Sequence, residues 1–322
     1  MKTFVIVTLS VGLLSCQQQV ESPSSQTERP SPTSSLENVT PPNSFDISGK
    51  ALKGPGQMGV PLSICGGTVD FQDVELYDGT LGVTKQYVET HEPSTVQFRW
   101  LSSTEIEATD PTIIAGNISE VRWCTGTLLS DNRVLTAAHC FEPSTQGWQT
   151  PQKLSGELLN AFELAPLQTV IFEYQKNGNT SQVRPGRPYA ITELLEYGFD
   201  RAGGLDYAIV RVGADANGNL PSGNETEASI SMDKILNGDQ VTILQHPAGE
   251  PKKVESGSIL GTNNVDVYYK NLDTLGGSSG SSVRDDNGNI VAVHTNGGCT
   301  EQPNSANRGV SILAIAPVSN EI

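Results

Sequence analysis

The chain has 322 residues, and its 36 acidic against 20 basic side chains give a formal net charge of −16. A general nucleic-acid binder needs a basic face, so the charge argues against nucleic acid as a partner. Beyond the N-terminus no apolar run is long enough to span a bilayer, and no repeat of fixed period is visible. The 32 glycines and 19 prolines are typical of short strands joined by turns.

Residues 1–15 have the pattern of an export signal. Lys2 is followed by an apolar stretch from Phe4 to Leu14, which is too short to remain in a membrane. The stretch ends in Leu-Leu-Ser-Cys, which resembles the lipobox of bacterial lipoproteins and would place a lipid anchor on Cys16. Gln17 is not the Asp that retains lipoproteins in the inner membrane. We therefore expect an outer-membrane lipoprotein or, if Cys16 is incidental, a secreted protein.

Residues 16–58 are expected to be a tether or a propeptide. Between residues 17 and 45, 19 of 29 positions are Ser, Pro, Gln or Thr. Such a segment buries too little apolar surface to offset its ordering entropy. A folded domain is therefore predicted over residues 59–322. It contains four cysteines, an even number that suggests two disulfides in an exported chain, and the residues alone leave three pairings open.

A histidine and an aspartate stand in contexts that suit catalysis. In Thr136-Ala137-Ala138-His139-Cys140 the small residues leave room for a substrate beside the histidine. Asp206 enters the short hydrophobic run 205–212, where a carboxylate can be buried and can hold a histidine tautomer. Asp200 and Asp215 compete for this role, but neither leads into such a strand.

A serine lies in a run that suits a nucleophile. Residues 274–282 read Thr-Leu-Gly-Gly-Ser-Ser-Gly-Ser-Ser. A nucleophilic serine needs glycines that let its turn aim backbone N–H groups at a developing oxyanion. A Ser/Gly run is also typical of a flexible loop, but a β-like run follows at 289–293, which a linker would lack.

Together, these segments resemble the chymotrypsin-like serine peptidases, in which the order is His, Asp, Ser. The resemblance covers roughly residues 60–322. It implies an all-β fold of two antiparallel Greek-key barrels, with the catalytic triad at their junction. By it, His139 is the general base, Asp206 orients His139, and Ser279 is the nucleophile. The backbone N–H groups of Gly277 and Ser279 would form the oxyanion hole.

The resemblance also implies the cysteine pairing. Cys124–Cys140 matches the disulfide that brackets the catalytic histidine of the family. Cys65–Cys299 then resembles the bond by which bacterial lysyl endopeptidases tie their N-terminal segment to the region after the catalytic serine. The segment Ile113-Ile114-Ala115-Gly116 looks like a trypsin activation site, but it lies too close to Cys124, so we interpret it as a strand.

Bacterial glutamyl endopeptidases are the subfamily whose motif matches best. Thr274 and His294 stand where that subfamily binds the carboxylate of a P1 glutamate. Asp273 lies six residues before Ser279, where trypsins hold the acid that receives Lys or Arg, although an Asp-Thr pair also occurs among glutamyl endopeptidases. We therefore expect a preference for acidic P1 residues, with a trypsin-like Lys or Arg preference as the alternative.

The predicted function is an exported serine endopeptidase that cleaves protein or peptide substrates. The alternative from another class is a lipoprotein with a peptidase fold that binds without turnover, and the intact triad argues against it. No Cys/His spacing suggests zinc and no phosphate loop is present, so neither a metal nor a cofactor is expected. The run 285–289 is interpreted as a β-turn rather than a calcium loop, and His246 as a structural histidine.

Overall fold

The computed structural model describes residues 62–65, 68–145, 148–200, 202, 204–300, 302 and 305–322. The predicted export signal at 1–15, Cys16 and the segment 16–58 lie outside the described residues, as does the predicted start of the folded domain at residue 59. None of the described helices is long and apolar enough to cross a membrane.

Six antiparallel strands close into a first barrel, in the order β10-β6-β5-β3-β8-β9. The strands are rich in β-branched and aromatic residues, which pack well on a pleated surface. Between β5 and β6 the chain turns through Asp131 and Asn132, whose φ angles of 57° and 59° suit a tight hairpin turn. The strands are β3 (Thr95–Trp100), β5 (Arg122–Leu128), β6 (Arg133–Thr136), β8 (Gln168–Phe172), β9 (Arg187–Asp200) and β10 (Leu205–Val212).

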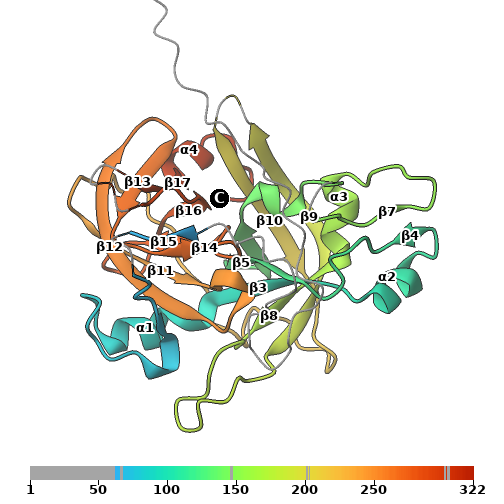
Figure 1. The fold of residues 1–322 in the computed structure, drawn as a ribbon, viewed down its shortest axis with the longest axis horizontal. Coiled ribbons are helices and arrows are strands. Elements are labelled where there is room, and N and C mark those ends of the chain that lie inside the picture. The colour runs from blue at the N-terminus through green and yellow to red at the C-terminus, as the bar shows by residue number, and fades with distance from the viewer. Residues whose placement is uncertain are drawn as a thin grey trace, which may run out of the picture. The chain divides into compact units, whose positions relative to one another are not determined.

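A second antiparallel barrel follows in the chain, in the order β11-β15-β16-β17-β13-β12, and the pairing of β11 with β12 closes it. Figure 1 shows the two barrels side by side, the second carrying the orange and red strands. The prediction of two antiparallel barrels is therefore confirmed. The strands are β11 (Gln240–Gln245), β12 (Lys253–Thr262), β13 (Asp266–Lys270), β15 (Ser282–Arg284), β16 (Ile290–Asn296) and β17 (Asn307–Ser311).

Short elements decorate the barrels. The predicted strand at Ile113 is present, because β4 (Ile113–Ile114) pairs with β7 (Gln152–Lys153). The run 285–289 forms the predicted turn between β15 and β16, closed by the backbone bond from Asp285 N to Asn289 O at 3.0 Å. The helices are α1 (Lys85–His91), α2 (Ser103–Thr109), α3 (Ala161–Leu164) and α4 (Ile312–Ile315), and the 3-10 turns are η1 (Val74–Leu76), η2 (Glu92–Ser94), η3 (Ala138–Phe141), η4 (Ala165–Leu167) and η5 (Pro247–Gly249).

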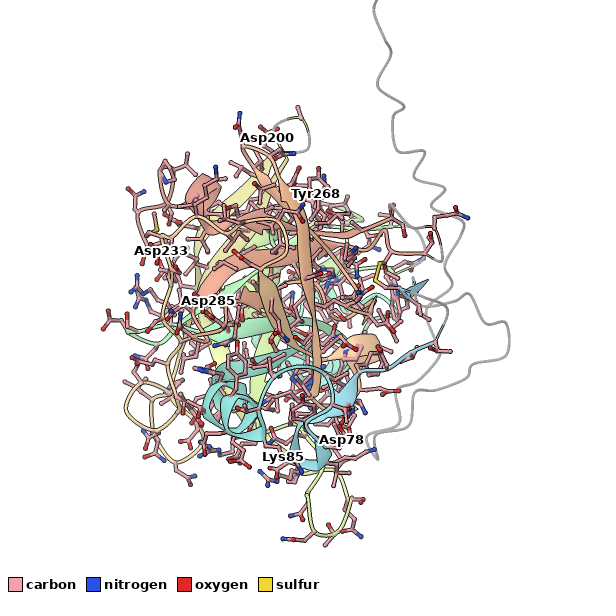
Figure 2. The ribbon with its side chains drawn as sticks, turned by 90° about the vertical axis from the view of Figure 1, so that its left-hand side faces the viewer. Asp78, Lys85, Asp200, Asp233, Tyr268 and Asp285 are labelled. Carbon is pink, nitrogen blue, oxygen red and sulfur yellow. A yellow bond between two sulfur atoms is a disulfide. The ribbon has the colours of Figure 1, made fainter. Side chains whose placement is uncertain are left out.

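The N-terminal part of the described chain packs on the second barrel. The strand β2 (Gln72–Asp73) extends the barrel at β12, and β1 (Leu62–Ser63) pairs with β14 (Thr274–Leu275). From α1 the hydroxyl of Tyr87 donates to the backbone carbonyl of Asp285 at 2.7 Å. Figure 2 shows the labelled Asp285 and, lower in the view, Lys85 at the start of α1.

One apolar cluster joins the two barrels. Val134 and Ile209 of the first barrel belong to the same buried cluster as Val293 and Val310 of the second. The interior of the second barrel has a separate cluster, to which Val283 and Val291 belong. Because the shared cluster is closely packed, it holds the facing sides of the barrels in a defined relation. The candidate catalytic residues lie along this junction.

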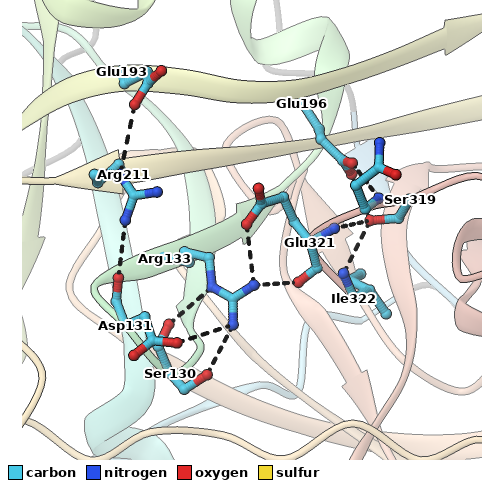
Figure 3. Close-up of polar contacts among 10 residues, drawn as sticks. Ser130, Asp131, Arg133, Glu193, Glu196, Arg211, Ser319, Glu321 and Ile322 are labelled. Atoms are coloured by element: carbon cyan, nitrogen blue, oxygen red, sulfur yellow. Dashed lines mark hydrogen bonds and ion pairs between the residues drawn. The ribbon is translucent and has the colours of Figure 1, made fainter.

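The segment after α4 reaches across to the first barrel, as Figure 3 shows. The guanidinium of Arg133, on β6, donates to the backbone carbonyl of Glu321 at 2.5 Å and also pairs with its carboxylate at 3.1 Å. The hydroxyl of Ser319 donates to the carboxylate of Glu196, on β9. These contacts tie the last described residues to two strands of the opposite barrel.

Candidate active site

His139 lies in η3, directly after β6, and two links hold this turn against β5. Cys140 forms the predicted disulfide with Cys124, with a Cα–Cα distance of 6.3 Å. The hydroxyl of Thr136 donates to the backbone carbonyl of Thr125 at 2.7 Å. The His139 side chain is 31% exposed, so part of the ring is accessible while the two links fix the backbone that carries it.

Asp206, the second residue of β10, holds His139 at two points. One carboxylate oxygen accepts a hydrogen bond from the backbone N–H of His139 at 2.9 Å, and the other lies 2.7 Å from its Nδ1. An ionised carboxylate only accepts, so Nδ1 carries the proton and Nε2 of the neutral ring is left as an acceptor. The competing residues Asp200 and Asp215 instead bind the backbone N–H groups of their own turns. The structure therefore brings Asp206 to the histidine.

The His139–Asp206 pair shifts both pKa values toward the charged forms. Burial alone would lower the pKa of His139, but the charge and hydrogen bond of Asp206, with a further contribution from Glu142, raise it above 6.5. Burial alone would raise the pKa of Asp206. The charge and hydrogen bond of His139, together with the backbone N–H groups that donate to the Asp206 carboxylate, lower that pKa instead. The pair therefore stabilises an imidazolium, the form that a general base reaches after accepting a proton.

Ser279 sits in a tight turn between β14 and β15 that is seated on the first barrel. Its carbonyl accepts from the N–H of Thr125 at 2.8 Å. The next residue, Gly280, has φ of +85°, and a Cβ there would lie 2.1 Å from the Thr136 hydroxyl. Only glycine fits at this position. The turn that carries Ser279 is thereby pressed against the segment that leads into His139.

Thr125 links the first barrel to this turn with its side chain as well. Its hydroxyl donates to the carbonyl of Gly277 at 2.8 Å and accepts from the N–H of His246 at 3.0 Å. Gly277 has φ of +102°, and a Cβ there would lie 2.6 Å from the His246 carbonyl. The three residues form one packed unit behind Ser279.

The backbone N–H groups of Gly277 and Ser279 are available for a developing oxyanion. Neither donates a hydrogen bond to another residue in the described part of the chain. The turn is braced on either side, because the N–H of Ala248 donates to Gly276 at 2.6 Å and that of Gly280 donates to His294 at 2.8 Å. Preorganised donors of this kind are what an acyl-transfer site requires.

His246, interpreted from sequence as structural, is buried and makes contacts of that kind. Its Nδ1 lies 2.9 Å from the carbonyl of Glu250, which fixes the proton on Nδ1. Burial, followed by the nearby Lys252 charge, lowers its pKa well below 6.5. The imidazole therefore stays neutral and supports the η5 turn behind Gly277.

Thr274 and His294, the candidate specificity residues, are both almost fully buried beside the turn that carries Ser279. Nδ1 of His294 is hydrogen-bonded to the hydroxyl of Tyr269, on β13. Burial, then the His139 charge, lowers the pKa of His294 to about 3 against the opposing effect of Asp206. Burial raises the pKa of Tyr269 well above 10. Sequence reasoning missed Tyr269, because it lies in an ordinary β-like run with no motif around it.

Asp273 faces the N-terminal segment. Asp273 is only 1% exposed. Its carboxylate oxygens accept hydrogen bonds from the backbone N–H of Cys65 at 2.6 Å and from that of Asp70 at 3.3 Å. Burial, opposed by the Cys65 hydrogen bond and reinforced by Asp70, raises its pKa to about 6. The second predicted disulfide, Cys65–Cys299, is also present, with a Cα–Cα distance of 5.0 Å.

Two further residues hold this region and were not found from sequence. The hydroxyl of Ser63 accepts from the N–H groups of Gly298 and Cys299, each at 2.8 Å. Asn307 binds Ser63 and donates to the carbonyl of Leu272 at 2.6 Å. No sequence motif links these positions, since they are more than 200 residues apart from Ser63 in the chain.

Two groups of side chains have the composition of a metal site. Cys124, His139 and Cys140 cluster, but the two sulfur atoms are joined in a disulfide and cannot act as thiolate ligands. The second group is formed by Asp70, Glu255 and Asp273. It supplies only carboxylate oxygens.

The similarity of this chain to known proteins points to one family. A family model described as a trypsin-like peptidase domain matches residues 124–293, just over half of the chain. No curated protein matches the chain. Among solved structures, one titled "Structure of Glu endopeptidase in complex with MPD" is similar, with 19% sequence identity and a TM-score of 0.47. The match covers 78% of this chain and 95% of that one.

Proposed function

Since this chain belongs to the family of trypsin-like peptidase domains, we propose that it is a serine endopeptidase whose triad is Ser279, His139 and Asp206. The observation that carries the proposal is the double contact of His139 with Asp206, at 2.9 and 2.7 Å, next to the turn that bears Ser279. A histidine held in this way is a general base, since its free Nε2 can accept a hydroxyl proton.

The proposed reaction proceeds in two halves. In the first, His139 Nε2 takes the proton of the Ser279 hydroxyl while its oxygen attacks the scissile carbonyl, and the negative charge that forms on the carbonyl oxygen is met by the N–H groups of Gly277 and Ser279. The protonated His139 then gives its proton to the leaving amine, and an acyl-enzyme remains. In the second half, water replaces the amine and releases the acid.

Labelling by a fluorophosphonate probe tests this assignment, because the probe reacts only with an activated serine. The wild-type chain should become labelled at Ser279, whereas Ser279→Ala and His139→Ala should not be labelled. Ser155→Ala, which changes an exposed serine outside the site, should be labelled like the wild type. A labelled Ser279→Ala variant would refute the assignment, and an unlabelled wild type would favour a binding protein without turnover.

For specificity, we propose that Thr274 and His294 receive the carboxylate of a P1 glutamate. The proposal requires that the Tyr269 hydroxyl donates to Nδ1 of the buried, neutral His294, so that the ring proton lies on Nε2. Such an N–H can donate to a substrate carboxylate. The matching Thr-x-Gly-Gly-x-Ser-Gly-Ser motif supports the same preference.

The placement of Asp273 weighs against the trypsin-like alternative. An acid that receives Lys or Arg must present its oxygens to the pocket, but Asp273 is buried and accepts from the backbone of Cys65 and Asp70. We therefore keep the acidic P1 preference.

We further propose that the enzyme is exported and held at a membrane by lipid on Cys16. The support is the apolar stretch that ends at Leu-Leu-Ser-Cys. Intact-mass measurement of the native protein tests it, because lipidation removes residues 1–15 and adds the mass of acyl chains. A mature N-terminus elsewhere, without added mass, would refute the anchor but leave the peptidase assignment unaffected.

A further inference from the structure

Three carboxylates meet beside the segment that leads into Thr274. Asp70, Glu255 and Asp273 each place one oxygen within 4.8 Å of the others. They come from the N-terminal segment, from β12 and from the turn before β14. The pairing of β2 with β12 and of β1 with β14 brings these three parts of the chain together.

Two of the three are buried, and none is neutralised by a basic side chain among the described residues. Glu255 is 0% exposed and Asp273 is 1% exposed. One oxygen of Glu255 accepts from the N–H of Ser256 at 2.8 Å, while its Oε2 is buried without a hydrogen-bond partner in the described chain. The neighbouring cation on β12, Lys253, pairs with other acids instead. The unpartnered oxygen belongs to a fully buried member of the cluster.

Such an arrangement needs a positive species. Buried carboxylates that face one another repel when all of them are ionised. At least one must therefore take up a proton, or the group must bind a cation. Burial raises the pKa of Glu255 to about 9, and the facing Asp70 carboxyl raises it further. The same two causes act on Asp273.

We propose that Asp70, Glu255 and Asp273 bind a calcium ion. All the ligands are carboxylate oxygens, which calcium prefers, whereas zinc sites use nitrogen and sulfur. Calcium–oxygen distances of about 2.3–2.6 Å allow two ligand oxygens on one ion to lie up to about 5 Å apart, in agreement with the observed cluster. Asp70 is exposed, so water can complete the coordination from its side. This site was not anticipated from sequence, because its ligands are spread over 200 residues.

The ion would join two parts of the chain that border the candidate specificity pocket. Asp273 directly precedes Thr274, and Asp70 follows Cys65, whose disulfide reaches Cys299. Bound calcium would also cancel negative charge near the place where a P1 carboxylate is proposed to bind. This last consequence rests on the proposed function, but calcium binding does not.

Calorimetric titration of CaCl₂ into the full chain, freed of metal by a chelating resin, tests the proposal. We expect one ion per chain and a melting temperature raised by several degrees, with weaker binding of Mg²⁺, which demands a tighter octahedral site.

Asp70→Asn, at an exposed position, should fold and should weaken binding at least about tenfold, since a charged ligand is lost. Glu255→Gln should abolish binding. Asp233→Asn is the matched control, because Asp233 is exposed and is not one of the three clustered carboxylates. Its affinity should equal that of the wild type. No saturable binding up to about 10 mM Ca²⁺, an affinity unchanged in Asp70→Asn, or Mg²⁺ binding as tightly as Ca²⁺ would each overturn the proposal.

Discussion

The two oxygens of the Asp206 carboxylate contact two different parts of His139, the backbone N–H at 2.9 Å and the ring Nδ1 at 2.7 Å. The first contact fixes the carboxylate relative to the η3 turn, and the second fixes the tautomer and the plane of the ring. A single side chain therefore sets both the position and the protonation of the candidate base.

The pH dependence of activity follows from this pair. The base must be neutral, and its pKa is raised above 6.5, so kcat/KM should fall as the pH drops through a midpoint above 6.5. Asp206→Asn should reduce kcat by about 10⁴, as in the best-known triad, and should move the acid limb to lower pH. A pH profile of peptide hydrolysis measures both effects. An acid midpoint near pH 5 in the wild type would contradict this role for His139.

Loss of Ser279 or of His139 should cost about as much as loss of both. Ser279→Ala, His139→Ala and the double variant should each reduce kcat by a factor on the order of 10⁶, because triad members act as a unit. Single-turnover assays with a peptide substrate, with Ser155→Ala as the control, provide the measurement. If the two single effects multiplied in the double variant, the residues would be acting independently.

The Cys65–Cys299 bond closes a loop with a sequence separation of 234. Replacing both cysteines by Ala should lower the free energy of unfolding by about 2–5 kcal/mol. Denaturant titration followed by tryptophan fluorescence gives this value, and non-reducing peptide mapping verifies the pairing. An unchanged stability would mean that the contacts of Ser63 and Asn307 suffice to hold the N-terminal segment.

A panel of peptides that differ only at P1 separates the specificity models. His294→Ala should reduce kcat/KM for P1 Glu by roughly 10- to 150-fold, since a charge-assisted bond is worth about 1.5–3 kcal/mol, with little change for P1 Leu. Tyr269→Phe should reduce it less, because the His294 ring remains but loses the hydroxyl that fixes its tautomer. Faster cleavage after Arg than after Glu, abolished by Asp273→Ser, would establish the trypsin-like alternative instead.

The Thr125 hydroxyl should matter for catalysis because it holds the turn that bears Ser279. Thr125→Val leaves the carbonyl of Gly277 and the N–H of His246 without their partner, a cost of about 1–3 kcal/mol in stability. Because the N–H of Gly277 is a proposed oxyanion donor, kcat should fall as well. Thr127→Val on the same strand is the control: its hydroxyl contacts Ser282, outside the turn, so it should change stability with little change in kcat.

The parts of the site that could be predicted are those whose residues form a recognisable pattern within a short stretch of the sequence. Gly277 and Gly280, on either side of Ser279, are required by close backbone approach, so they leave a trace in the sequence. The strand that begins at Asp206 carries its own apolar run. The two barrels and both disulfides could be predicted because the family resemblance supplied the long-range pairing.

The parts that could not be predicted depend on contacts between distant segments. Tyr269 reaches His294 only because β13 and β16 both pair with β17. Asp70 meets Glu255 only because β2 adds to the edge of the second barrel at β12. Such contacts are selected by tertiary packing and carry no local propensity, so no window of the sequence signals them.

The apolar cluster shared by the barrels has a consequence for how the enzyme unfolds. Val134 and Ile209 belong to the same buried cluster as Val293 and Val310, so separating the barrels would expose apolar surface on both. Neither half can lose its structure while the other remains intact. The described part of the chain should therefore melt in one cooperative transition, and amides on both sides of the junction should exchange with solvent at a common, slow rate.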